Sequence, residues 1–286
     1  MPLDSRNRVA VVGAGTMGHG IAQVAAMAGC ETRLTDANGE VLAAAREGID
    51  ANLAGAVSRG KLTREQADAA RGRITEVADL ADAVRGADLV IEAVAEDLGA
   101  KQALFQRIES LVADTAILAT NTSSLSVTEI AHATRRPERV VGMHFFNPVH
   151  IMKLVEVVMH AGIDPSVVAA TRGLAERMGK TTILVQDTPG FASSRLGVAL
   201  GLEAMRMLEQ GVASAADIDT AMELGYGHPM GPLRLSDLVG LDIRLKIAEY
   251  LHRELGDATF APPQVLRDKV LRGDLGKKTG KGFYEW

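Results

Sequence analysis

A histidine and a glutamate on two apolar segments are the first residues whose types and spacing could do chemistry. Residues 140–145 form an apolar run that delivers His144 to its end, and Glu156 interrupts a second apolar run at 153–158. Burying an ionised carboxylate costs on the order of several kcal/mol unless the charge is paired. Glu156 therefore either faces solvent from a sheet edge or has a cationic or hydrogen-bonding partner, and His144 is the nearest candidate.

A carboxylate that orients an imidazole and makes it more basic is a common way to build a general base near neutral pH. The spacing of His144 and Glu156 is therefore compatible with acid–base catalysis. A histidine with a purely structural role also fits this spacing, so the pair alone leaves both interpretations open.

A glycine-rich turn joins a predicted strand at 8–12 to a predicted helix at 17–28. Its residues follow the pattern G-x-G-x-x-G and include Gly13, Gly15, Thr16, Met17 and Gly18. In such a turn the first glycine allows the tight bend, the second lets the backbone approach a pyrophosphate, and the third permits close helix packing. The helix N-terminus presents N–H groups to the anion. The turn therefore predicts a dinucleotide site.

An acidic residue follows the next predicted strand, at 31–35, as a dinucleotide site requires. Asp36 would accept hydrogen bonds from the ribose hydroxyls and repel a 2'-phosphate. Its neighbour is Ala37, which cannot compensate as an arginine would. The sequence therefore predicts NAD as the cofactor in preference to NADP.

The composition limits the other partners. The 286 residues include 31 Lys and Arg against 36 Asp and Glu, for a formal net charge of -5, and only 3% are aromatic. Nucleic-acid binding usually needs a broad basic surface and often stacking aromatics, so we expect no nucleic-acid partner. No cluster of His, Cys, Asp and Glu has the spacing of metal ligands, so we expect no metal.

Cysteine usage and hydropathy indicate the compartment. Cys30 is the single cysteine and cannot form an intrachain disulfide. Residues 1–8 lack the apolar stretch of a signal peptide, and no segment approaches the roughly 18 consecutive apolar residues of a membrane span. We therefore expect a cytoplasmic protein with no membrane partner.

The order of predicted elements defines the fold class. Apolar runs alternate with helical segments up to about residue 186, and only helical patterns follow. We expect further strands at 88–94, 116–120, 140–145, 153–158 and 181–186, with helices at 39–58, 63–72, 98–112, 125–133, 195–210, 214–224 and 236–255. Such alternation predicts an α/β fold, a Rossmann-type, doubly wound, mostly parallel sheet, followed by an all-α C-terminal domain. The predicted domains are 1–186, which binds NAD, and 187–286.

Six segments together resemble the L-3-hydroxyacyl-CoA dehydrogenase family. They are GAGTMG at 13–18, ATNTSSL at 119–125, GMHFFNPVHIMKLVEVV at 142–158, DTPGF at 187–191, HPMGPLRLSDLVGLD at 228–242 and GKKTGKGFYEW at 276–286. The motifs are long, occur in the family's order and span nearly the whole chain. Within the family, the sequence is most similar to the short, single-function bacterial 3-hydroxybutyryl-CoA dehydrogenases.

The resemblance implies NAD-dependent oxidation of a 3-hydroxyacyl-CoA, with roles for individual residues. His144 matches the family's general base and Glu156 its orienting carboxylate. Ser123 matches a residue at the substrate carbonyl and the nicotinamide, and Asn147 one that places the thioester and the cofactor. The further matches to cofactor contacts are Glu96, Lys101 and Lys278.

The match departs from the family at one substrate position. Ser194 stands before the arginine that opens the long C-terminal helix, where the family commonly has asparagine, so the contact to the acyl or CoA group differs. A basic group of Arg59, Lys61 and Arg64 could meet the CoA phosphates, and we assign that contact to Lys61. A solvated helix turn is the alternative interpretation of this group.

Two other functions and an assembly state complete the expectations. The same scaffold could oxidise a free 3-hydroxy acid or sugar acid, or it could bind NAD without catalysis. The C-terminal helices carry apolar stretches at 196–205 and 235–243 that exceed what about 100 residues can bury. Because two-fold dimers are the commonest closed assembly, we expect a homodimer through residues 190–286, as the resemblance also implies.

Overall fold

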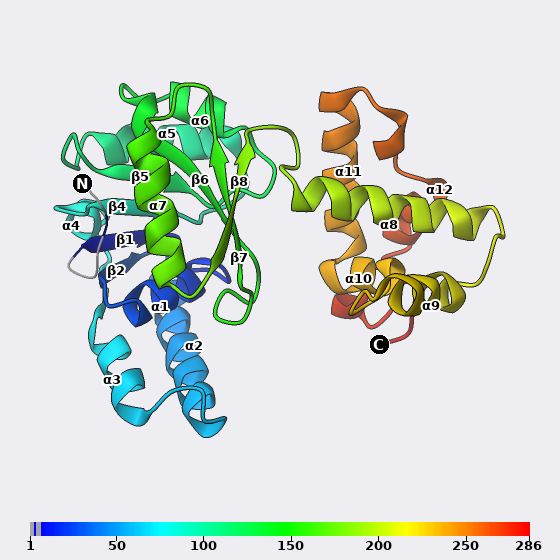
Figure 1. The fold of residues 1–286 in the computed structure, drawn as a ribbon, viewed down its shortest axis with the longest axis horizontal. Coiled ribbons are helices and arrows are strands. Elements are labelled where there is room, and N and C mark those ends of the chain that lie inside the picture. Colours follow the sequence, from blue (N-terminus) through cyan, green and yellow to red (C-terminus); the bar gives the residue numbers. More distant parts are fainter. Residues whose placement is uncertain (1–2, 4–6) are drawn as a thin grey trace. The chain divides into compact units, whose positions relative to one another are not determined.

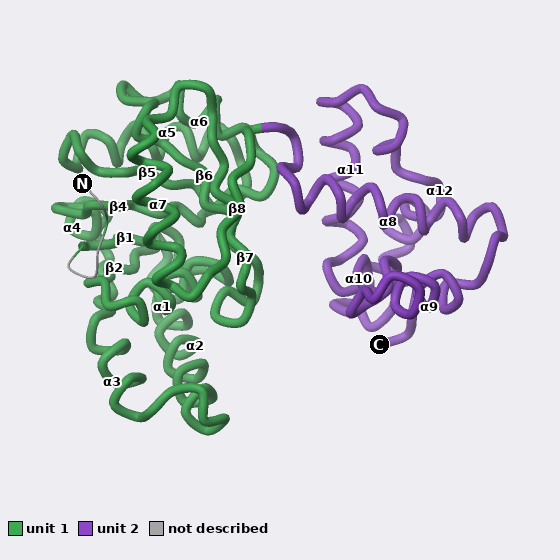
Figure 2. The backbone as a smooth tube through the Cα atoms, in the orientation of Figure 1, with its two compact units in different colours: residues 1–187 green, residues 188–286 purple. Residues whose placement is uncertain are grey.

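The chain forms two compact units in the computed structural model, which describes residue 3 and residues 7–286. The units are Met1–Asp187 and Thr188–Trp286 (Figure 2). The first unit alternates strands and helices around one sheet, and the second is helical. This confirms the predicted fold class, a Rossmann-type α/β unit followed by an all-α unit.

One eight-stranded sheet organises the first unit. Its strands are β1 (Arg8–Val12), β2 (Glu31–Thr35), β3 (Ile74–Glu76), β4 (Leu89–Glu92), β5 (Ile117–Thr120), β6 (Val140–Phe145), β7 (Leu154–Met159) and β8 (Thr181–Gln186). They lie in the order β3-β2-β1-β4-β5-β6-β7-β8, and every neighbouring pair is parallel except β6 and β7. The strand order reverses between β1 and β4, which is where an open α/β sheet binds its ligand, beyond the carboxyl ends of the strands.

Helices cover the sheet of the first unit. They are α1 (Gly18–Met27), α2 (Gly39–Ser58), α3 (Arg64–Gly72), α4 (Leu80–Val84), α5 (Leu98–Glu109), α6 (Val127–His132) and α7 (Pro165–Arg177), with a short 3-10 turn η1 (Pro137–Arg139). Helices α1, α2, α3 and α7 share a hydrophobic core with alternate residues of the strands. In Figure 1, α2 and α3 form a pair that extends away from the sheet.

Besides the short η1, the structure adds β3, α4 and α7 to the elements that the sequence predicts in this unit. β3 has three residues and α4 has five, too few to show a periodic apolar pattern. α7 has 13 residues and begins with Asp164, whose side chain caps the helix, and Pro165 at its first position. This Asp-Pro start is a recognised helix signal that the sequence interpretation missed.

The second unit packs its helices around its own core. Its elements are α8 (Ser193–Glu209), α9 (Ala215–Tyr226), α10 (Pro232–Val239), α11 (Leu241–Leu255), η2 (Ala258–Phe260), α12 (Gln264–Leu271) and η3 (Lys277–Thr279). The helix expected at 236–255 is in fact two helices, because Gly240 adopts a φ of +105° between α10 and α11. That conformation is open to glycine and ends a helix.

The last residues of the chain are fixed to the second unit. The carboxylate of Asp237 accepts hydrogen bonds from the backbone N–H groups of Phe283 and Tyr284 and from the indole N–H of Trp286.

Across the described residues, no helix is both long and apolar enough to cross a membrane.

Candidate active site

His144 and Glu156 lie directly opposite each other in the sheet. β6 and β7 are antiparallel, and their register pairs these two residues. The Nδ1 atom of His144 lies 2.7 Å from Oε2 of Glu156, and both side chains are buried. The ring of Phe146 packs against the imidazole at a centroid distance of 4.5 Å. The structure therefore brings together the two residues that the sequence placed on adjacent strands.

The contact fixes the tautomer of the imidazole. An ionised carboxylate only accepts hydrogen bonds, so Nδ1 of His144 must carry the proton that it donates to Glu156. In the neutral ring the lone pair then lies on Nε2, which is the nitrogen able to accept a proton. A buried anion beside the ring also stabilises the imidazolium that forms on proton uptake.

The glycine turn has the geometry of a pyrophosphate cradle. Gly13 has a φ of +98°, and a Cβ there would lie 2.6 Å from the carbonyl oxygen of Ala93. A Cβ on Gly18 would lie 1.7 Å from the carbonyl oxygen of Gly13. A Cβ on Gly15, by contrast, would meet nothing of the protein within 4 Å. Packing therefore requires the outer two glycines, whereas Gly15 leaves an open approach for a ligand.

The N-terminus of α1 is available to an anion. Met17 at the N-cap makes no side-chain capping hydrogen bond, and the first turn contains no acidic residue. Gly15 and Thr16, which precede it, are exposed. Helix N-terminal N–H groups without side-chain partners bind phosphates well because the helix dipole adds to their hydrogen bonds.

Asp36 is held in place at the end of β2. One carboxylate oxygen accepts a hydrogen bond from the backbone N–H of Ala14 at 2.8 Å, and the other accepts one from Asn38 at 2.9 Å. These contacts join the acidic residue to the glycine turn. A carboxylate in this position can accept hydrogen bonds from ribose hydroxyls.

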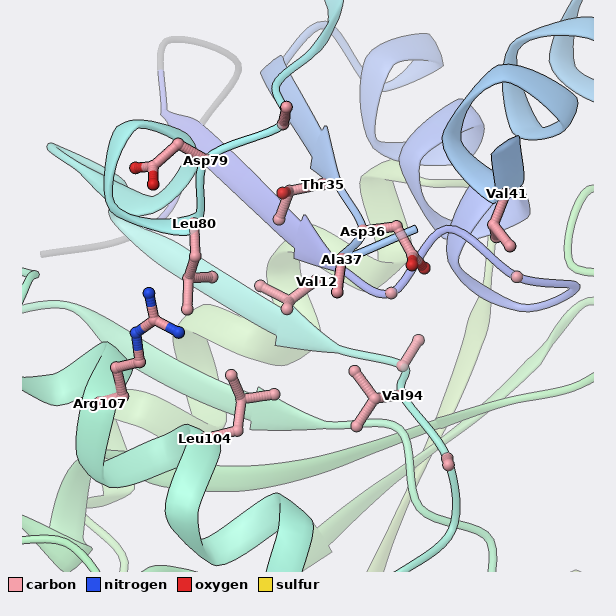
Figure 3. A pocket seen from close by; sticks show the side chains of 15 residues that line it. Val12, Thr35, Asp36, Ala37, Val41, Asp79, Leu80, Val94, Leu104 and Arg107 are labelled. Atoms are coloured by element: carbon pink, nitrogen blue, oxygen red, sulfur yellow. The ribbon is translucent and has the colours of Figure 1, made fainter. Parts of the chain in front are cut away.

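A cavity of about 560 Å³ adjoins the glycine turn and Asp36. Figure 3 shows its walls, with Asp36 and Val41 on one side, Leu104 and Arg107 on another, and Leu80 near them. The further lining residues are mostly apolar and include Val12, Ala37, Ala78, Ala93 and Val94. An apolar slot beside a ribose-binding carboxylate has the size and chemistry to take the adenosine part of NAD.

Ser123 and Glu96 are joined at the carboxyl ends of β4 and β5. Oε1 of Glu96 accepts hydrogen bonds from the hydroxyl of Thr122 at 2.6 Å, from the backbone N–H of Ser123 at 2.8 Å and from the Ser123 hydroxyl at 3.2 Å. Burial raises the pKa of Glu96, but Lys101 and these donors outweigh it and hold the pKa below the usual value. Glu96 is therefore an anion at neutral pH.

Lys101 is completely buried and connects two glutamates. Its Nζ atom lies 2.6 Å from Oε1 of Glu92 and 3.3 Å from Oε2 of Glu96. The sequence interpretation missed Glu92, which is the last residue of β4 and is 0% exposed. The sequence does contain a signal for this residue, because Glu92 lies inside the apolar run 88–94 and a buried glutamate needs a partner.

Asn147 lies in the turn that follows β6. The residue is exposed, and its peptide bond to Pro148 is cis. The buried ammonium of Lys180 donates hydrogen bonds to the backbone carbonyls of Val149 and Met152. Burial lowers the pKa of Lys180. The turn that carries Asn147 is thus tied to the start of β8.

Lys61 belongs to a group of basic side chains, here called the basic cluster, formed by His19, Arg59, Lys61 and His150. Burial lowers the pKa of His150, and the positive charges of His19, Arg59, Lys180 and Lys61 lower it further. These residues come from α1, the turn after α2 and the turn after β6. The lowered pKa leaves His150 neutral at pH 7, so Arg59 and Lys61 contribute the permanent positive charges of the cluster.

Ser194 and Lys278 belong to the second unit. Ser194 lies in the first turn of α8, and Nζ of Lys278 forms an ion pair with Asp242 at 2.5 Å.

Over the residues that the structure describes, no group of three or more His, Cys, Asp or Glu side chains could hold a metal ion.

The sheet order, the glycine turn and Asp36 together define a dinucleotide-binding protein of the Rossmann class. Comparison with protein families identifies one family within this class. Residues 8–188 match the 3-hydroxyacyl-CoA dehydrogenase NAD binding domain, and residues 190–286 match the C-terminal domain of the same family. The chain belongs to the 3-hydroxyacyl-CoA dehydrogenase family, whose members are NAD-dependent oxidoreductases.

Relatives of known name extend over nearly the whole chain. A probable 3-hydroxybutyryl-CoA dehydrogenase of Bacillus subtilis is 44% identical over 279 residues, which cover 98% of this chain and 97% of the relative. The 3-hydroxybutyryl-CoA dehydrogenase of Mycobacterium tuberculosis is 44% identical, with 99% of both chains covered. The crystal structure of (S)-3-hydroxybutyryl-CoA dehydrogenase from Ralstonia eutropha matches with a TM-score of 0.95 at 37% identity, over 98% of this chain and 99% of that one.

Proposed function

We propose that this protein oxidises L-3-hydroxyacyl-CoA thioesters, 3-hydroxybutyryl-CoA first among them, to 3-ketoacyl-CoA, and catalyses the reverse reduction. The observation that carries the proposal is the buried contact of 2.7 Å between His144 and Glu156. It supplies an oriented base in a family that binds NAD. The names of the relatives at 44% identity support the substrate.

His144 is the general base in this mechanism. Bound NAD would supply the acceptor for the hydride of C3. Nε2 of His144 takes the proton of the 3-hydroxyl, and Glu156 keeps the opposite nitrogen protonated and stabilises the imidazolium. In the reduction, the imidazolium returns this proton to the oxygen at C3.

Ser123 and Asn147 hold the reacting groups. The hydroxyl of Ser123, now at 3.2 Å from Glu96, can turn to the oxygen at C3 while the backbone N–H keeps its contact to Glu96. Asn147 is exposed in the turn after β6, where its amide can contact the thioester and the cofactor. Positioning of this kind lowers the entropic part of the barrier.

The other assigned residues hold the ends of the two ligands. Glu96 and Lys278 would contact the nicotinamide side of NAD, and Lys101, whose side chain is fully buried, would act there through Glu96. The glycine turn and Asp36 would hold the pyrophosphate and the adenosine ribose. Lys61, within the basic cluster, binds the phosphates of CoA, which is supported by the positive charge gathered around His150. Ser194 contacts the acyl or CoA group through its hydroxyl.

The protein acts as a homodimer that associates through residues 190–286. The second unit exposes large apolar side chains, which include Leu196, Leu224, Tyr226 and Leu271, at 72%, 83%, 80% and 88% exposure. Exposed apolar surface of this extent favours burial against a second copy.

Rates with a panel of substrates test the proposed function. NADH oxidation is followed with acetoacetyl-CoA, with 3-ketoacyl-CoAs of longer chain, and with free acetoacetate and free sugar-derived keto acids. We expect turnover of the CoA thioesters, greatest for acetoacetyl-CoA, and a kcat/KM at least about a hundredfold lower for the free acids, because these lack the binding energy of CoA. Equal or higher kcat/KM for a free acid would contradict the proposal and favour the free-acid alternative.

A further inference from the structure

Three charged side chains form a group at the carboxyl end of β4, in which Glu92 and Lys101 are buried and Glu96 is partly exposed. Glu92, Glu96 and Lys101, here called the Lys101 cluster, are linked by contacts of 2.6 Å and 3.3 Å from the ammonium to the two carboxylates. Glu92 is 0% exposed, and its oxygens also accept hydrogen bonds from the backbone N–H of Val94 at 2.7 Å and the hydroxyl of Thr120 at 2.8 Å. The cluster is therefore fixed by the sheet itself.

The cluster carries more negative than positive charge. Two carboxylates share one ammonium, so the formal sum is one negative charge. The ammonium of Lys101 and the backbone N–H of Val94 both donate hydrogen bonds to Glu92, and a carboxylate accepts such bonds. A net charge surrounded by protein acts over a longer distance than one in water, because the local dielectric is lower and salt screens it less.

The proposed function places the nicotinamide next to this cluster, and the inference rests on that placement. Glu96 holds both the backbone N–H and the hydroxyl of Ser123, the residue assigned to the nicotinamide and the substrate oxygen. Oxidised nicotinamide carries a positive charge on its ring, whereas the reduced ring is neutral. A fixed negative charge nearby therefore stabilises NAD+ and has little Coulomb interaction with the ring of NADH.

We propose that Glu92, acting through Lys101 and Glu96, sets the relative affinity of the protein for oxidised and reduced NAD. Glu92 is a positioning residue, because it holds Lys101 and does not touch the cofactor. If Glu92 were neutral, Lys101 would compensate Glu96 fully and the net charge of the cluster would disappear. The preference for NAD+ over NADH would then decrease, which favours NADH-bound enzyme at equal concentrations of the two forms.

The test is the ratio of two dissociation constants in the variant Glu92→Gln. Titration calorimetry with NAD+ and with NADH gives Kd for each form, and their ratio removes any equal loss of binding that a structural defect causes. We expect the ratio Kd(NAD+)/Kd(NADH) to rise about three- to tenfold. The Coulomb energy between one unit charge and a nearby charged nicotinamide ring corresponds to a change in Kd of this size. Binding of ADP-ribose, which lacks the nicotinamide, should change less than twofold.

Two control variants separate charge from structure. Glu109→Gln removes a buried carboxylate from the other end of α5, where Glu109 contacts Arg135 and Arg136, so it changes the net charge equally at a distance from Ser123. Thr120→Val removes a hydrogen bond to Glu92 but leaves its charge. Both should leave the ratio within twofold of the wild type. A ratio that is unchanged in Glu92→Gln, or that rises as much in Glu109→Gln, overturns the proposal.

A second variant covers a failure of Glu92→Gln to fold. Glu96→Gln removes the other negative charge of the cluster, and its side chain is 37% exposed, so the fold tolerates it more readily. The ratio should rise in this variant too, and an unchanged ratio overturns the proposal. Turnover of acetoacetyl-CoA by the wild type decides the proposed function separately. If the wild type is active and the ratio does not respond, only the role of Glu92 is wrong.

Discussion

The imidazole of His144 and the carboxylate of Glu156 are in contact because their strands pair in a register that sets the two residues opposite each other. Side chains directly opposite in an antiparallel pair start about 5 Å apart at Cβ and lie on the same face of the sheet. A shift of one residue would turn one of them to the other face. The backbone of β6 and β7 therefore sets the orientation of the proposed base.

Replacing the proposed base should slow the reaction without loosening the cofactor. His144→Gln should lower kcat about 10²- to 10⁴-fold, which is the usual contribution of proton transfer to a positioned group. The Kd for NADH should stay within threefold, because the proposed function assigns the binding of the cofactor to the glycine turn and Asp36. Steady-state rates and a fluorescence titration measure both. As a control, replacing the exposed His132 by Gln should leave the rate unchanged, and a rate of His144→Gln within threefold of the wild type would refute the assignment.

Removing the carboxylate beside the imidazole should slow the oxidation. Glu156→Gln leaves a side chain of similar size, but its amide can donate a hydrogen bond to Nδ1, so the ring is no longer held with its lone pair on Nε2. We expect kcat to fall by about tenfold or more, because the proposed base is then misoriented or in the wrong tautomer. Steady-state rates measure the loss, and a kcat within twofold of the wild type would argue against the pairing.

The sequence predicts the parts of the site that depend on local pattern. The strand at 8–12, the glycine turn and Asp36 follow one another within about 30 residues, and the strand at 140–145 is found with its predicted bounds. Glu156 was predicted to need a partner because an isolated buried carboxylate is costly, and His144 was the candidate. Such arguments work because strand alternation and burial leave few alternatives.

Contacts between distant segments could not be predicted in this way. The basic cluster joins residues from α1, from the turn after α2 and from the turn after β6, and no periodicity in the sequence indicates that these segments meet. Glu92 lies in an apolar run that the sequence predicts as a buried strand, and the glutamate was not recognised as part of the site. The short β3 and α4 carry too few residues for a periodic signal.

Asp36 should decide between the two nicotinamide cofactors. Asp36→Ala should weaken the binding of NADH more than that of NADPH. NADH loses the hydrogen bonds between its ribose and the carboxylate, whereas for NADPH the repulsion between the carboxylate and the 2'-phosphate disappears. The ratio of kcat/KM for NADH to that for NADPH should fall at least tenfold. Asp79, on another wall of the same cavity, provides a matched control, since Asp79→Asn should change the ratio less than threefold. A wild type that prefers NADPH would refute the interpretation of Asp36.

Glu109 should contribute to stability in a pH-dependent way. Burial raises the pKa of its carboxyl, but hydrogen bonds from the backbone and side chains of Arg135 and Arg136 outweigh this and hold the pKa below its usual value of 4.5. A carboxyl whose pKa is lower in the folded state stabilises the protein above the unfolded pKa and loses that effect as the pH falls through the folded pKa.

Glu109→Gln should therefore lower the free energy of unfolding by about 1–3 kcal/mol at pH 7. The gap to the wild type should shrink as the pH falls below about 4.5, because the wild-type carboxyl then gains a proton. Urea unfolding curves at pH 7, 5 and 4 measure the gap. A difference that stays constant or widens toward low pH would contradict the role of the ionised carboxylate.

The second unit should associate with a second copy of itself. Its exposed leucines and Tyr226 lie on α8, α9, α10 and α12, outside the core to which all five helices of this unit contribute. Burying such side chains stabilises by about 25 cal/mol for each Å² of apolar surface removed from water, so a standard interface is well within reach. Light scattering at micromolar concentration should give twice the chain mass of 30.2 kDa. Dilution should increase deuterium exchange only in residues 190–286, and a monomer with full activity would show that the dimer is not the working form.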